Sequence, residues 1–166
     1  MSCIATFYLL LESQHTEFIA AHRDEKKVTY KSTLFGKKEI VTGEKYLWEY
    51  LDDAAKTKED LPYSGFVLVD YLFVFTTFPE DLDAELTAVE IDEHYTVFSA
   101  DLASRLAEYF KANPPADKAL TTFAAEERPG ENATEYAEAL REVHGLFLAW
   151  MQRVNPGEFG VLHLSF

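Results

Sequence analysis

The sequence predicts an α+β fold, a single domain spanning residues 1–166 in which helices pack on a mixed or antiparallel sheet. Hydrophobic residues make up 48% of the chain, which is enough for one well-filled core. Residues 3–11 and 159–166 are apolar and strand-like, whereas residues 99–154 are mostly helical in pattern. Because strands and helices do not alternate regularly, the α+β fold is favoured over the alternative, a doubly wound α/β sheet.

The longest apolar run covers residues 65–78 and is rich in aromatic and β-branched side chains. We interpret this run as the central strand of the sheet, ended by Pro79. Asp70 is its one carboxylate. The sequence predicts that Asp70 marks a bend or bulge in the strand, where it bonds to nearby backbone amides. The alternative is a buried general acid or base with a raised pKa, which would need a partner.

Apolar residues at helical spacing predict helices over residues 44–55, 100–112 and 134–154. Thr42 is the predicted N-cap of the first helix and Ser99 that of the second. A short helix is expected after Ser13, and a brief one around residues 120–124.

The other segments carry weaker patterns. Residues 28–35 alternate loosely and fit either an edge strand or an irregular connection, and residues 86–91 alternate like a strand. Residues 56–62 are predicted to be a polar exit from the preceding helix.

The formal net charge is −14, and from Glu80 to Asp101 there are eight acidic residues and no lysine or arginine. Nucleic-acid binding requires a basic surface that releases counterions from phosphates, so this charge argues against it. The same field repels anionic membranes and favours a basic protein partner. The sequence leaves the oligomeric state open.

The single cysteine, Cys3, has no partner for an intrachain disulfide. The apolar runs are too short to span a membrane, and the first one lacks the flanking features of a signal peptide. These features predict a soluble, cytoplasmic protein.

The chain contains no phosphate-binding loop, dinucleotide fingerprint, nucleophile elbow or metalloprotease helix, so we predict no cofactor. The nearest approach to a set of metal ligands is Asp92, Glu93 and His94, together with Glu90. Adjacent residues on a strand point to opposite faces, so this run cannot supply several ligands to one ion. We therefore predict no metal site.

The candidate catalytic residues are Asp70, His94 and His144. His144 lies on the same predicted helical stripe as Leu140 and Phe147, a position that is more typical of a core histidine. The candidate binding residues are exposed aromatic or acidic side chains, since exposed aromatics mark interfaces: Trp48, Tyr50, Glu90, Asp92 and Glu93.

Three segments resemble the YfbM-like family of small bacterial proteins of unknown function. They are the apolar start Met1–Tyr8, the segment Lys45–Leu51 with its Trp-x-x-Leu spacing, and Tyr95–Leu102, where a strand enters a serine-capped helix. A long helix and an apolar C-terminal strand follow in the same order. The resemblance implies a fold and no mechanism.

Together these features favour a non-enzymatic protein–protein interaction module with an acidic surface, of which an immunity or inhibitor protein is one concrete form. The alternative is a small hydrolase or transferase that uses a carboxylate–histidine pair, Asp70 with His94 or His144.

Overall fold

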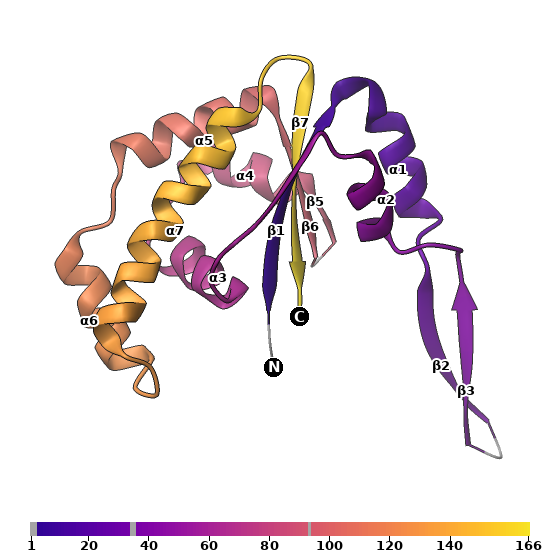
Figure 1. The fold of residues 1–166 in the computed structure, drawn as a ribbon, viewed down its shortest axis with the longest axis horizontal. Coiled ribbons are helices and arrows are strands. Elements are labelled where there is room, and N and C mark those ends of the chain that lie inside the picture. The colour runs from indigo at the N-terminus through magenta and orange to yellow at the C-terminus, as the bar shows by residue number, and fades with distance from the viewer. Residues whose placement is uncertain (1–2, 34–35, 93) are drawn as a thin grey trace.

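The computed structural model describes residues 3–33, 36–92 and 94–166, and these form an α+β fold with an antiparallel sheet (Figure 1). The main sheet has the strand order β4-β1-β7-β6-β5. Its strands are β1 (Ile4–Leu11), β4 (Thr57–Asp60), β5 (Glu90–Asp92), β6 (Tyr95–Ser99) and β7 (Glu158–Ser165). All of their pairings are antiparallel, so the α+β prediction is confirmed.

Helices cover both faces of this sheet (Figure 1). The larger layer holds α3 (Gly65–Val74), α4 (Glu80–Val89), α5 (Ala100–Ala112), α6 (Asp117–Glu127) and α7 (Ala133–Arg153). The smaller layer holds the 3₁₀ turn η1 (Glu12–Gln14), α1 (His15–Arg23) and α2 (Leu47–Ala54). Between α1 and α2 the chain forms a separate two-stranded sheet, β2 (Lys27–Thr33) and β3 (Gly36–Thr42).

The strand β1 separates two hydrophobic cores because its side chains alternate between the faces of the sheet. Phe7 and Leu9 belong to the larger core, whereas Tyr8 and Leu10 belong to the smaller one. The neighbouring strand β7 is buried in the same way on both faces, which explains why residues 3–11 and 159–166 are mostly apolar. These two strands form the centre of the sheet.

Residues 65–78 are not the central strand, and that prediction is wrong. Ser64 caps the helix α3 by accepting a hydrogen bond from the backbone amide of Phe66. An apolar run has no polar face, so its periodicity cannot distinguish a buried strand from a buried helix. Because the run is helical, Asp70 marks no strand bend: it lies on a regular turn of α3.

Three weaker predictions also change. Residues 86–91 are mainly helical, because α4 continues to Val89 before the short strand β5. Residues 57–60, predicted as a polar exit, pair with β1 at the edge of the sheet. The helix α2 begins at Leu47 and not after Thr42, and its N-cap is Tyr46. The backbone amide of Tyr46 donates a hydrogen bond to the Glu49 carboxylate, with 2.7 Å between nitrogen and oxygen.

The predictions for the other two periodic helices are confirmed. The helix α5 spans residues 100–112, and the Ser99 hydroxyl accepts the amide hydrogen of Leu102 at 3.1 Å. The helix α7 begins and ends within one residue of its prediction. Within the described ranges, no helix is both long and apolar enough to cross a membrane.

Candidate functional site

Asp70 is the centre of a buried polar cluster in the larger helical layer. Its exposed fraction is 9%. Both carboxylate oxygens accept hydrogen bonds from charged or phenolic donors. Nε of Arg128 donates to Oδ2 at 2.8 Å, and Nη2 of the same guanidinium donates to Oδ1. The Tyr136 hydroxyl also donates to Oδ2, at 2.6 Å. The guanidinium is therefore bidentate, the strongest geometry available to an arginine–carboxylate pair.

The three side chains come from separate parts of the chain. Asp70 lies on α3, Arg128 is the residue that follows α6, and Tyr136 lies in the first half of α7. The Asp70 carboxylate holds the pKa of Arg128 above its ordinary value, and burial followed by Asp70 raises the pKa of Tyr136 to about 12. Both donors therefore keep their protons at neutral pH, and the cluster joins three elements.

Chemically, this arrangement suits an anchor more than a general base. A general base needs a carboxylate oxygen within reach of a substrate proton. Here Oδ1 faces Arg128, and Oδ2 is shared by Arg128 and Tyr136.

His144 lies further along α7 in a second polar contact with α3. Its Nδ1 is 2.6 Å from the Tyr71 hydroxyl, and its ring packs edge-on against the rings of Tyr71 and Phe110. Burial lowers the pKa of His144 and raises that of Tyr71, so the imidazole is neutral at pH 7 and the phenol is protonated.

The half-buried His144 predicts acid sensitivity. The unfolded chain takes up a proton near pH 6.5, whereas the folded protein resists protonation until its lower pKa is reached. More protons bind to the unfolded state in that window, so the free energy of unfolding is expected to fall as the pH drops from 7 towards 5. The measurement is urea denaturation over this pH range, and His144→Gln is expected to flatten the slope.

Tyr71→Phe is the matched control for this titration. It removes the hydroxyl beside Nδ1 but leaves the half-buried imidazole in place, so the slope is expected to persist. An unchanged slope in His144→Gln would show that the dependence on pH comes from other groups.

His94 lies apart from both clusters, at the turn between β5 and β6. Its Nδ1 is 3.0 Å from the Leu164 carbonyl oxygen, and its ring is 5.9 Å from that of Phe166. The hydrogen bonds of the described residues join no two of Asp70, His94 and His144. The predicted carboxylate–histidine pair is therefore not assembled in this structure.

The structure does not describe the side chains of the acidic binding candidates. Glu90 and Asp92 lie on β5, but their side chains, like Glu93, lie outside the described residues, so their binding role stays a prediction. The described residues contain no group of three or more His, Cys, Asp or Glu that could hold a metal ion.

The aromatic candidates lie on α2, at the base of β2 and β3. Trp48 is 42% exposed and stacks on the ring of Tyr46, with 6.1 Å between the ring centroids. Tyr46 also carries the Lys26 ammonium over its ring at 5.1 Å. Tyr50 is half-buried and faces a polar groove of about 660 Å³ under the hairpin. These aromatics therefore form the junction between α2 and the hairpin.

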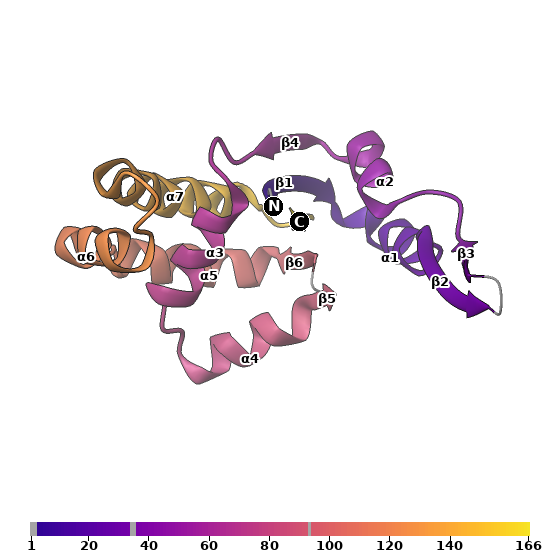
Figure 2. The same ribbon diagram turned by 90° about the horizontal axis from the view of Figure 1, so that it is seen from below.

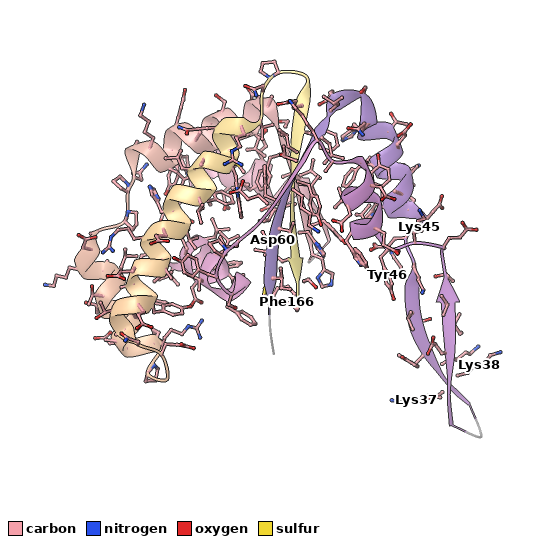
Figure 3. All side chains as sticks on the ribbon, in the orientation of Figure 1. Lys37, Lys38, Lys45, Tyr46, Asp60 and Phe166 are labelled. Atoms are coloured by element: carbon pink, nitrogen blue, oxygen red, sulfur yellow. The ribbon has the colours of Figure 1, made fainter. Side chains whose placement is uncertain are left out.

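Sequence reasoning missed an apolar stripe on the outer face of α3. It consists of Phe66, Val69 and Phe73, which are spaced by three and four residues and so share one side of the helix. Phe73 is 84% exposed, and the Phe66 ring lies 6.1 Å from that of Phe166 at the end of the sheet (Figure 3). The sequence offered no clear signal for this stripe, because a helix that is apolar on nearly all sides is usually buried.

The chain matches no family model, no curated protein and no solved structure. The resemblance to YfbM-like proteins therefore stays a prediction, and function is argued from the surfaces of the molecule.

Proposed function

We propose that this protein is a non-enzymatic protein–protein interaction module that binds a basic partner through the α3 stripe and the acids beside it. The observation that carries the proposal is the 84% exposure of Phe73 on a helix whose one charged residue is Asp70. Large aromatic side chains on a surface are typical of interface anchors, because they bury much apolar area for little conformational entropy.

The stripe is held in a fixed position. The Tyr109 hydroxyl accepts from the Thr77 amide and donates to the Thr77 carbonyl, both at 2.9 Å, which pins the segment after α3 against α5. On its inner face α3 is anchored to α7 through Asp70 and Tyr71. A partner would meet a rigid apolar surface, which lowers the entropic cost of binding.

Acidic side chains flank the stripe at both ends of α3. The first turn of α4 carries Glu80, Asp81 and Asp83 within nine residues of Val74. Near the start of α3, the Tyr63 hydroxyl donates to the exposed Glu142 carboxylate. Arg105 binds Asp81 at 2.7 Å and also binds Glu85, whereas Glu80 and Asp83 are exposed. Electrostatic complementarity would favour a partner with basic and apolar residues together, such as the target of an immunity or inhibitor protein.

The alternative, a hydrolase or transferase that uses a carboxylate–histidine pair, has less support. The Asp70 oxygens are occupied by Arg128 and Tyr136, and neither His94 nor His144 bonds to Asp70. No described contact favours this alternative.

The first test is affinity capture with immobilised protein, using lysate from the organism that carries the gene. The wild-type protein is expected to retain a basic protein at low salt, and Phe73→Ser is expected to lose it, because the substitution removes the exposed aromatic anchor. Glu80→Gln combined with Asp83→Asn is expected to weaken retention and its dependence on salt. Captured proteins are identified by mass spectrometry.

Leu11→Ser is the matched control, since Leu11 is also an exposed apolar residue but lies at the far end of β1. It is expected to retain the partner as the wild type does. Equal capture by wild type and Phe73→Ser would contradict the proposal.

A further inference from the structure

The strands β2 and β3 form a projecting arm, which we define as the described residues 26–33 and 36–45. The arm extends from the α1–α2 end of the molecule, well away from the main sheet (Figures 1 and 2). Its two strands pair only with each other in the described structure. An isolated two-stranded hairpin is marginally stable in water. An arm of this kind gains stability when another surface covers it.

The arm carries a charge opposite to that of the rest of the chain. It contains six lysines and two glutamates, for a formal charge of +4, which leaves −18 for the other residues. Lys37 and Lys38 lie towards its far end and Lys45 at its base (Figure 3). The negative net charge of the protein therefore conceals a basic arm.

The register of the arm places like charges opposite one another. Lys31 faces Lys38 across the two strands, and both side chains are exposed. Like charges in directly opposed positions destabilise a β-ladder. The pair therefore weakens an element that is already marginal, and an acidic partner surface would remove this repulsion.

The opposite face of the arm is apolar at its base and carries Glu39 and Lys37 further along. Val28 pairs with Val41, and the next residue on that face, Tyr30, is 65% exposed. Exposed aliphatic and aromatic side chains beside lysines suit a protein surface. Nucleic acid fits less well, because the −18 of the remaining residues would repel phosphates.

The complementary surface is an acidic stripe on the first half of α7. Glu135, Glu138 and Glu142 are exposed and follow one another at intervals of three and four residues on one face of α7, and the exposed Glu131 lies just before the helix. The neighbouring arginines are engaged elsewhere, Arg128 with Asp70 and Arg141 with Asp117. The stripe therefore keeps its negative charge.

The arm cannot reach the acidic stripe of its own chain. The arm lies at one end of the molecule, and α6 and the first half of α7 lie at the other, in two perpendicular views (Figures 1 and 2). We propose that the arm docks on the acidic stripe of a second copy of this chain. Two antiparallel copies would make this contact twice and form a closed two-fold dimer.

This dimer is separate from the interaction proposed for the α3 stripe. The arm lies on the other side of the sheet from α3, the helix that carries Phe73 (Figure 1). Apart from Glu142, which borders both surfaces, a partner bound at Phe73 and a second copy bound through the arm use different residues.

The test is the solution mass measured by sedimentation equilibrium. At about 0.1 M salt the wild-type protein is expected to show a mass twice the 18.9 kDa of one chain. At about 1 M salt the dimer is expected to dissociate, because the Debye length falls from about 10 Å to about 3 Å. The arm variant Lys31→Glu/Lys38→Glu and the stripe variant Glu135→Lys/Glu138→Lys are each expected to be monomeric. An equimolar mixture of the two is expected to recover the dimer, because both contacts are again between opposite charges.

The arm variant preserves the repulsion within the hairpin, since two glutamates oppose one another as two lysines do. Lys111→Glu on α5 is the control for charge reversal elsewhere and is expected to leave the dimer intact. A monomeric wild type at 0.1 M salt, or no recovery in the mixture, would overturn the proposal. So would binding of a short DNA duplex that the arm variant loses, which would assign the arm to nucleic acid. Phe73→Ser is expected to remain dimeric, so failure of the dimer and failure of the proposed function give different results.

Discussion

Replacing Trp150 with alanine is expected to lower the free energy of unfolding by about 3–5 kcal/mol, the range for removing a fully buried aromatic side chain. Trp150 has no exposed surface and lies on α7. Its ring stacks on Phe7 of β1 at 5.3 Å and meets Phe147 edge-on at 6.3 Å. Trp150 is therefore the main aromatic contact between the longest helix and the central strand.

The cavity is not expected to collapse, because Phe7 is held from its other side. Gly160 on β7 lies so close to this ring that a Cβ there would stand 2.5 Å from Cζ of Phe7. The Phe7 ring is thus confined between the backbone of β7 and the Trp150 indole. A site that cannot relax retains most of its cavity, which places the cost in the upper part of the range.

Urea denaturation measures the effect, with an unchanged m value showing that the folded state is intact. Trp150→Phe is the matched control. It retains a ring against Phe7 and removes an indole Nε1 that is buried without a hydrogen-bond partner among the described residues, so it is expected to cost less than about 1.5 kcal/mol. Equal losses for the two variants would mean that volume at this position does not determine stability.

The helix α7 illustrates what the sequence predicts well. Its large apolar residues recur every three or four positions from Tyr136 to Val154, and Asn155 and Pro156 end the pattern. The helix α5 is similar, since the Ser99 cap marks its start. In both cases the signal lies within a few residues of the element that it specifies.

The helix α3 illustrates the opposite case. Its type depends on what covers it, and in a run without polar residues this is decided by distant elements. The same holds for Asp70, whose partners Arg128 and Tyr136 lie 58 and 66 positions away in the sequence. A carboxylate in an apolar run could be recognised as unusual, but its partners could not be chosen from the sequence.

The basic arm and the acidic stripe are only partly predictable from the sequence. The spacing of Glu131, Glu135 and Glu138 is visible in the sequence, as is the excess of lysine over residues 26–45. Net charge over long segments obscured both, because it sums residues that the fold places at opposite ends of the molecule. The register that opposes Lys31 to Lys38 becomes visible only when the two strands are paired.

The second large effect is expected at the Asp70 cluster. Asp70→Ala is expected to lower the free energy of unfolding by about 2–3 kcal/mol. This is less than the roughly 3–5 kcal/mol lost when one partner of a fully buried ion pair is removed, because the Arg128 side chain is 39% exposed and can regain water. Tyr136→Phe, which removes one hydrogen bond to the carboxylate, is expected to cost about 1.5 kcal/mol.

The order of three variants tests the anchor interpretation. Arg128→Met leaves the carboxylate without its cation in a site that is only 9% exposed, so it is expected to cost more than Asp70→Ala. The double variant Asp70→Ala/Arg128→Met removes both charges and is expected to be more stable than Arg128→Met alone. Chemical denaturation of the four proteins completes a double-mutant cycle, whose coupling energy isolates the pair. Additive losses would contradict the anchor, because they would mean that Asp70 holds α3 through contacts other than the Arg128 guanidinium.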